Sequence, residues 1–234
     1  MEARKQFQTL YSTIKRDVTL YNRDEFRCVD KLLDKTIDYN ILNRNHYMIF
    51  PVITAYNLLT EYETKISESI KLAHVLDWCA ELIVTSYIML DDMMDHSKFR
   101  WGQKCWYSLP EGKATIFITT TMRAFSNKLL NHYFSEKPYH TLLKDLIYET
   151  NYFSNLGFIN ENCLSNISKE KNSIDHFTID MYEALAESRN AYALCRIAMY
   201  SAFYLTETNF HHLREDLQNI FLKISHIHQA QVSG

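Results

Sequence analysis

The sequence predicts a single all-α domain that spans residues 1–234. The chain contains only 4 glycines and 3 prolines, too few for the many tight turns of a β-sandwich or a Rossmann-type fold. Apolar residues recur about every 3.6 positions from end to end, without an internal repeat or a linker rich in proline and serine. Hydrophobic residues make up 47% of the chain and charged residues 23%, which excludes a disordered or fibrous protein.

The periodicity predicts helices separated by a few clear breaks. The expected helices cover residues 6–21, 24–40, 47–61, 67–95, 113–134, 138–156, 175–205 and 209–231. Breaks are expected at Trp101-Gly102, at Leu109 to Gly112 and at Lys137-Pro138, because glycine and proline interrupt helices. The stretch 160–173 is rich in Asn and Ser, which predicts an exposed loop.

Charge and cysteine content narrow the class of protein further. A net charge of -3 and a pI near 6.4 indicate no basic surface for nucleic acid. No uncharged apolar run reaches the roughly 20 residues of a membrane span, and the N-terminal segment lacks the continuous apolar core of a secretory signal. The 5 cysteines are odd in number and lack paired spacing, so we expect reduced thiols. These features predict a cytoplasmic protein.

The segment 67–95 is the most informative of the expected helices. Its apolar residues follow one helical stripe up to Ile83, and from Ile83 to Leu90 the sequence is apolar almost all round. Such a helix spans roughly 42 Å at 1.5 Å per residue. We therefore expect it to run through the middle of the domain, buried on every side, until it ends in three aspartates.

Asp91, Asp92 and Asp95 stand together at the end of this apolar helix. Asp91 and Asp95 lie one turn apart and Asp92 about 100° around, so the three carboxylates can converge on one cleft. Neighbouring carboxylates repel one another and lose solvation unless a cation balances them, and Mg²⁺ suits such oxygen donors. The alternative, of equal weight from the aspartates alone, is a solvated acidic helix end or a cap for a following helix.

The residues that follow the aspartates strengthen the functional interpretation. Residues 91–107 read DDMMDHSKFRWGQKCWY and resemble the first aspartate-rich motif of trans-isoprenyl diphosphate synthases, in particular the DDxMDxSxxRRGQxCWY of farnesyl diphosphate synthases. The matching positions are Asp91, Asp92, Asp95, Ser97, Arg100, Gly102, Gln103, Cys105, Trp106 and Tyr107. Weaker landmarks at 38–40, 139–157 and 182–202 extend the resemblance over most of the chain. It implies an isoprenoid synthase fold, with helices around a central cavity.

The resemblance implies an allylic diphosphate site that contains magnesium. In such a site Asp91, Asp92 and Asp95 hold Mg²⁺, while Arg100 and Gln103 contact the allylic prenyl diphosphate. Arg189 stands where the family has a lysine that serves the same diphosphate, and arginine keeps the charge with a planar fork. The alternative for Arg189 is a solvated helix residue.

Two further positions are expected to shape the hydrocarbon end of this site. Ser86 and Tyr87 lie five and four residues before Asp91, where the family sets the depth of its cavity. A small Ser86 would deepen the pocket, and Tyr87 would still floor it. These two residues predict a substrate of ten or fifteen carbons, and ordinary core packing is an equally weighted alternative for either.

The isopentenyl diphosphate side departs from the family. Asn45 and Met48 stand at the lysine and arginine that grip isopentenyl diphosphate, and Trp101 replaces another arginine that touches it. Arg44 could substitute only if the register slips. A diphosphate without cations loses solvation uncompensated. The pattern therefore predicts a terpene synthase acting on geranyl or farnesyl diphosphate. The alternatives are a farnesyl or geranyl diphosphate synthase, which elongates the chain, and a non-catalytic partner of a full-length synthase.

The C-terminal sequence departs from the family as well. The family's second aspartate motif reads like FFQxQDDxxD, whereas residues 226–234 read HIHQAQVSG. Gln229 and Gln231 match, and Val232-Ser233 stand where the paired aspartates should be; Phe158 likewise replaces a glutamine after Gly157. We therefore expect a C-terminally incomplete domain that lacks the C-terminal helices, paired as a homodimer or as a heterodimer with a full-length paralogue.

Overall fold

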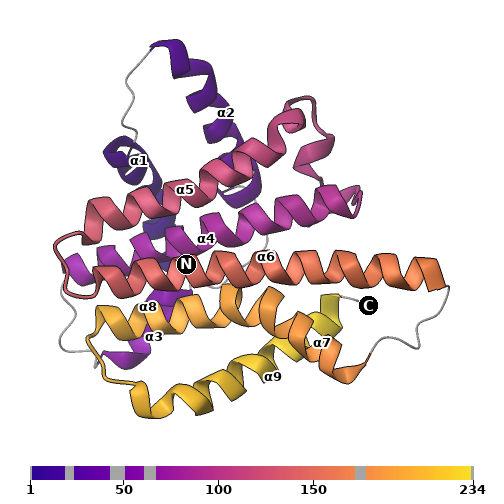
Figure 1. Ribbon diagram of the computed structural model, residues 1–234. Helices are drawn as coiled ribbons and strands as arrows, with labels where there is room; N and C mark the ends of the chain where they lie inside the picture. The colour runs from indigo at the N-terminus through magenta and orange to yellow at the C-terminus, as the bar shows by residue number, and fades with distance from the viewer. Residues whose placement is uncertain (1, 19–23, 43–50, 61–66, 172–177, 233–234) are drawn as a thin grey trace.

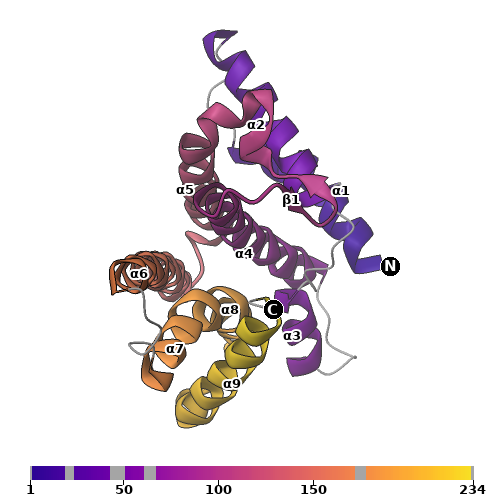
Figure 2. The same ribbon diagram turned by 90° about the vertical axis from the view of Figure 1, so that its right-hand side faces the viewer.

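The long helix α4 (Ser67–Met94) lies at the centre of the molecule, with the other helices arranged on both sides of it (Figure 1). In this computed structural model the described residues are 2–18, 24–42, 51–60, 67–171 and 178–232. Figure 2 shows α4 between two groups of helices, with those within residues 2–37 and 115–134 on one side and those within residues 51–59, 140–171 and 179–232 on the other. Because helices make up almost all of the described residues, the all-α prediction is confirmed.

The other helical elements of the described chain are of three types. The α-helices are α1 (Glu2–Val18), α2 (Arg27–Ile37), α3 (Pro51–Leu59), α5 (Thr115–Phe134), α6 (His140–Lys171), α7 (Ile179–Ala186), α8 (Ile197–Leu205) and α9 (Arg214–Val232). Two π-helical segments are η2 (Asp38–Leu42) and η5 (Glu187–Arg196), and the 3-10 turns are η1 (Asp24–Phe26), η3 (Trp106–Ser108), η4 (Pro110–Ala114) and η6 (His211–Leu213).

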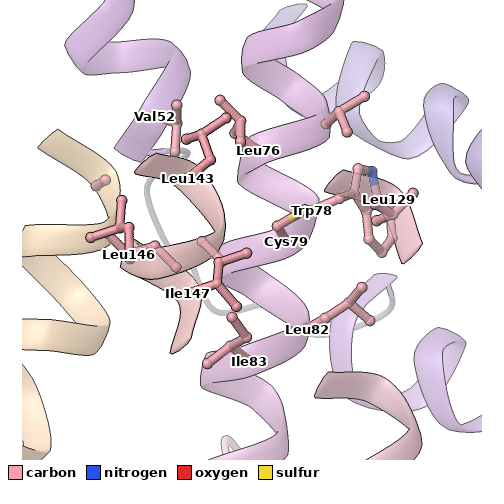
Figure 3. Packing of buried hydrophobic residues seen from close by; sticks show 14 of the residues in the cluster. Val52, Leu76, Trp78, Cys79, Leu82, Ile83, Leu129, Leu143, Leu146 and Ile147 are labelled. Atoms are coloured by element: carbon pink, nitrogen blue, oxygen red, sulfur yellow. The ribbon is translucent and has the colours of Figure 1, made fainter. Parts of the chain in front are cut away.

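The core is built on all sides of α4, as the sequence predicts. Trp78, Leu82 and Ile83 are fully buried, and Figure 3 shows them among side chains from α3, α5 and α6. Burying an apolar side chain of this size contributes about 1.5–3 kcal/mol. The helix Glu68–Met94 is long and apolar enough to cross a membrane, but 94% of its apolar 18-residue window is buried inside the fold. That burial is what a core helix requires, and it explains the apolar composition without a membrane.

A buried carboxylate on α4 holds the start of α3. Asp77 accepts hydrogen bonds from the backbone N–H groups of Val52 (2.8 Å) and Ile53 (3.3 Å). These are N–H groups of the first helical turn, which have no partner within the helix. Burial raises the pKa of Asp77, although the two N–H groups and His74, whose Nδ1 lies 3.6 Å from Oδ2, act against the rise. The carboxylate therefore fixes α3 against α4 at the cost of its own solvation.

The predicted break at Trp101-Gly102 is the turn of a small hairpin. Trp101 and Gly102 both have positive φ angles, 51° and 79°, as the two central residues of a type I′ turn require. The turn joins β1 (Phe99–Arg100) to β2 (Gln103–Lys104), with Arg100 paired opposite Gln103. Because opposed residues project to the same face of a hairpin, the turn brings Arg100 and Gln103 side by side.

The second predicted break, at Gly112, is a position where only glycine fits. A Cβ atom at Gly112 would lie 2.3 Å from the backbone oxygen of Tyr107 and 2.4 Å from that of Trp106. We expect Gly112→Ala to lower the free energy of unfolding by about 2 kcal/mol, since overpacking against backbone atoms cannot relax by side-chain rotation. Urea unfolding measures this change. Gly102→Ala is the comparison, because its Cβ would meet no atom within 4 Å and would be disfavoured by φ alone; an equal loss in both variants would contradict the steric explanation.

The loop predicted for residues 160–173 was wrong. Helix α6 continues without a break to Lys171, and residues 172–177 lie outside the described part of the chain. Asn and Ser are only moderately poor helix formers, and this stretch contains no glycine or proline. Leu164 is buried on this extension, so tertiary packing outweighs the weak local preference. The consequence for the site is that α6 carries side chains past Gly157 into the region of Asp91.

Candidate functional site

The site begins where α4 leaves the core. Asp92 is buried with 4% exposure, Asp91 is half-buried and Asp95 is exposed. The backbone oxygens of Asp91 and Asp92 still accept hydrogen bonds from the N–H groups of Asp95 and Ser97, both at 2.9 Å. The three predicted carboxylates therefore occupy one helix end, with Asp95 at its solvent-facing rim.

Arg100 bridges the first two aspartates. Its Nε donates to Asp92 Oδ1 at 2.7 Å, and its Nη2 lies 2.6 Å from the same oxygen and 3.2 Å from Asp91 Oδ2. The hairpin described above positions this side chain, because Arg100 is the last residue of β1 before the turn. Burial raises the pKa of Asp92 even though Arg100 acts to lower it. The charge of this carboxylate is therefore only partly compensated by its arginine.

Arg189 reaches Asp91 from the opposite side. It lies on the π-helical segment η5, and its Nη2 donates to Asp91 Oδ1 at 2.7 Å. Its Nη1 pairs with Glu161 of α6. Only 15% of the Arg189 side chain is exposed, so the guanidinium is ion-paired rather than solvated. Asp91 thus has an arginine on each of its two oxygens.

Glu161 is a site residue that the sequence reasoning missed. Burial raises the pKa of its carboxyl, with Arg189 opposing and the charges of Asp91 and Asp95 adding to the rise. It lies on the part of α6 that the sequence predicts as a loop, and a loop prediction does not indicate which way its side chain faces. Its spacing of four residues from Gly157, at the end of a matched landmark, is the signal that could have indicated it.

The donor chemistry of this site suits magnesium. Within the described ranges, no three His, Cys, Asp or Glu side chains gather closely enough to hold a metal ion by themselves. Mg²⁺ commonly takes only one or two carboxylates and completes its shell with water and phosphate oxygens. Burial raises the pKa of Asp95 as well, and the charge of Asp91 adds to this. An added cation would therefore stabilise the ionised forms of these carboxylates.

A pocket adjoins the aspartates on the hairpin side. Its lining includes Asp92, Arg100, Trp101, Gln103 and Lys104. The predicted contacts Arg100 and Gln103 thus share one pocket with Trp101, which stands in place of an isopentenyl-binding arginine. Two cations, those of Arg100 and Lys104, line it. Arg44, Asn45 and Met48 lie outside the described residues, so the predicted loss of cations at Asn45 and Met48, and its compensation by Arg44, stay predictions.

Ser86 and Tyr87 do not line this pocket, and their side chains contact α5 and α6 instead. Ser86 is fully buried, and its Oγ accepts a hydrogen bond from Arg123 Nη1 of α5 at 3.0 Å. Tyr87 donates to the backbone oxygen of Asn151 on α6 at 2.9 Å, and its ring stacks on Phe158. The Arg123 side chain occupies the space that a small residue at 86 leaves. The roles of both residues in setting substrate length stay predictions.

The matched glutamines near the C-terminus lie on α9. Gln229 is buried, and its Oε1 accepts a hydrogen bond at 2.7 Å from Asn190, the residue after Arg189. Gln231 is exposed, and Ser233 lies outside the described residues. Gln229 therefore contacts the segment that carries Arg189.

Comparison with known proteins gives a match to one family. A family model described as polyprenyl synthetase matches residues 30–231. The chain is 28% identical to farnesyl pyrophosphate synthase 1 of Cannabis sativa, with 98% of this chain and 67% of that protein covered. It is 24% identical to farnesyl pyrophosphate synthase of Murgantia histrionica, with 97% and 55% covered, and 27% identical to a bifunctional chrysanthemol synthase of Tanacetum cinerariifolium, with 97% and 57% covered.

These relatives decide between two of the interpretations of the sequence. The chain spans between about half and two thirds of the length of the relatives it matches. The terpene synthase interpretation is not supported, and the alternative of a prenyltransferase that elongates prenyl chains fits better. Of the three positions at which a cation is missing, Asn45 and Met48 lie outside the described residues, and the described pocket around Trp101 still contains Arg100 and Lys104.

Proposed function

Since the chain belongs to the polyprenyl synthetase family, we propose that it binds an allylic prenyl diphosphate and acts as a prenyltransferase of isoprenoid biosynthesis. The observation that carries this proposal is the pair of arginines, Arg100 and Arg189, that converge on Asp91 at the end of a buried helix. In this reaction the allylic C–O bond breaks, diphosphate leaves, a carbon–carbon bond to isopentenyl diphosphate forms, and that second substrate loses a proton.

The residues of the site would act mainly by balancing charge. Arg100 and Arg189 are held near one carboxylate, and a diphosphate would offer both guanidinium groups oxygen partners of the same sign and similar geometry. Exchanging one anionic partner for another requires little reorganisation, which is the condition for effective electrostatic stabilisation of a leaving group. The three aspartates of the motif would hold magnesium: Asp91, Asp92 and Asp95. When bound, the metal supplies further positive charge that balances the charge of the diphosphate.

The pocket lined by Trp101 and Lys104 is our candidate for the isopentenyl diphosphate subsite. It adjoins Asp92 and Arg100, so a second substrate there would lie next to the allylic diphosphate. Lys104 is exposed and provides a cation at the pocket, while Trp101 offers an apolar wall that excludes water from a carbocation.

An isopentenyl-dependence assay tests the proposed function. Purified protein is incubated with Mg²⁺ and dimethylallyl or geranyl diphosphate, with and without isopentenyl diphosphate, and the product length is measured by chromatography after dephosphorylation. We expect products longer by one five-carbon unit only when isopentenyl diphosphate and Mg²⁺ are both present. Hydrocarbon or alcohol formed from the allylic substrate alone would instead favour a terpene synthase, and the absence of any turnover would favour a non-catalytic partner.

We also propose that the chain pairs with a second copy or with a longer relative. Exposed apolar side chains recur along one stripe of α6, at Tyr148, Tyr152, Leu156 and Ile159. Contiguous apolar surface of this kind is typical of an interaction site. Sedimentation velocity tests the self-association: a dimer weakened by Tyr152→Glu supports it, and a monomer at all concentrations contradicts it.

A further inference from the structure

The position of Arg189 depends on more than its two ion pairs. Besides Asp91 and Glu161, its guanidinium carbon lies 4.6 Å from the ring centroid of Phe158. The two terminal nitrogens point to carboxylates on different helices, α4 and α6, while the guanidinium carbon lies over an aromatic ring. The ion pairs and the ring contact together restrict the position of the guanidinium.

Phe158 is itself held in place. Its ring stacks on Tyr87 with centroids 5.4 Å apart and an angle of 11° between the planes. Tyr87 in turn is fixed by the hydrogen bond from its hydroxyl to the backbone oxygen of Asn151. The Arg123 guanidinium carbon also lies over the Tyr87 ring, 5.1 Å from its centroid. The ring beneath Arg189 therefore belongs to a packed column that connects α5, α4 and α6.

The residue before Phe158 lets Arg189 approach α6. A Cβ atom at Gly157 would lie 2.9 Å from Cγ of Arg189 and 2.8 Å from Oγ of Ser188. The aliphatic stem of Arg189 thus passes over a bare stretch of helix backbone before its head reaches the Phe158 ring. Gly157 and Phe158 contact the stem and the head of the same side chain.

Phe158 and Arg189 are also two positions at which the sequence departs from the resemblance described above, glutamine to phenylalanine and lysine to arginine. The structure places these two departures in direct contact. A planar guanidinium stacks on a ring and still donates from both ends, whereas the ammonium of a lysine is a point charge that cannot bridge two carboxylates in this way.

We propose that Phe158 is a positioning residue for Arg189, holding the guanidinium in the plane from which it reaches Asp91 and a bound diphosphate. The diphosphate part of this inference rests on the proposed function; the pairing itself rests on contacts in the ligand-free protein. If Phe158 only filled space between α6 and η5, its substitution would change the free energy of unfolding to the same extent whatever side chain stood at position 189.

A double-mutant cycle tests the pairing. Phe158→Leu, Arg189→Lys and the double variant are compared with the wild type, by calorimetric binding of inorganic diphosphate with Mg²⁺ and by urea unfolding without ligand. We expect Phe158→Leu to weaken diphosphate binding about threefold to tenfold with arginine at 189, and by less than about twofold in the Arg189→Lys background. Equal effects in both backgrounds would overturn the proposal.

Two further variants separate positioning from packing. Phe158→Tyr keeps the ring and is expected to bind diphosphate within about twofold of the wild type. Phe153→Leu is the matched control, because Phe153 is on the same helix and its ring stacks on Tyr192 at 4.2 Å. It should lose stability without losing diphosphate affinity; a loss of affinity equal to that of Phe158→Leu would contradict positioning.

The unfolding cycle keeps this test separate from the proposed function. If the wild type binds no diphosphate, the proposed function fails, and the ligand-free cycle decides the pairing alone. Non-additive changes in the free energy of unfolding would then support positioning of Arg189 by Phe158, and additive changes would overturn it.

Discussion

Asp91→Ala is expected to lower the free energy of unfolding by about 2 kcal/mol and to reduce prenyl transfer at least about 100-fold. Removing one partner of a buried ion pair costs about 3–5 kcal/mol. Here the side chains of Asp91, Arg100 and Arg189 retain 18%, 29% and 15% exposure, so solvent screening reduces that figure. The substitution also leaves Arg189 and Arg100 facing each other without the carboxylate between them. Urea unfolding and the isopentenyl-dependence assay measure the two effects.

Asp95→Ala is the matched control for the stability part of this prediction. It makes the same change of charge one helical turn away, but Asp95 is exposed and has no ion pair with a described residue. Its effect on the free energy of unfolding should stay within about 0.5 kcal/mol, as at most surface positions. Equal destabilisation by both variants would mean that the loss of negative charge at this helix end, rather than the two arginine contacts, determines stability.

The second large effect is expected at Asp77, far from the site. Asp77→Ala should lower the free energy of unfolding by about 3 kcal/mol, because two buried N–H groups at the start of α3 lose their acceptor. Asp77→Asn keeps one acceptor oxygen and should be milder, at about half that loss. Urea unfolding compares the two variants. A loss as large in asparagine as in alanine would indicate that the negative charge, rather than hydrogen bonding, holds α3.

The buried carboxyl of Asp77 also predicts a pH dependence of stability, which a comparison of the wild type with Asp77→Asn would show. Burial raises the pKa of Asp77 in the folded protein, so folding favours the protonated carboxyl. Its contribution to stability is full below the unfolded pKa of about 3.9 and falls as the pH rises through the folded pKa. The wild type should therefore lose stability with rising pH more steeply than Asp77→Asn, in which this group does not titrate. His74 is present in both, so the difference between their curves reports Asp77; parallel curves would contradict the raised pKa.

The features that the sequence predicts best are those with strong local causes. The expected helix 67–95 matches α4 to within one residue at its end, because an all-round apolar run and a terminal aspartate cluster leave little alternative. The turn at Trp101-Gly102 follows from a backbone conformation that glycine permits, and the break at Gly112 follows from a close approach of the backbone that leaves no room for a Cβ atom. The first aspartate motif and Arg100 are separated by fewer than ten residues, so their proximity could be read from spacing alone.

What the sequence could not provide are contacts made between distant segments. Asp91 and Arg189 are 98 residues apart, and only the packing of η5 beside α4 brings them together. The sequence does not indicate Glu161, because weak Asn and Ser preferences predict a loop there, whereas the burial of Leu164 keeps α6 helical. The π-helical form of η5 leaves no clear mark in composition, since its residues are ordinary helix formers.

That π-helical form changes the direction in which side chains project around the axis of the helix 179–205. A π turn closes its hydrogen bond over one residue more than an α turn, and one residue corresponds to about 100° of rotation around the axis. Arg189 lies near the start of η5 and Arg196 at its end, so the wider turns change the direction of Arg196 relative to Arg189 from that in a continuous α-helix. In this arrangement Arg189 reaches Asp91 of α4 and Arg196 reaches Glu149 of α6. Deleting a single residue within 190–195 would restore ordinary winding and turn one of the two arginines away from its carboxylate.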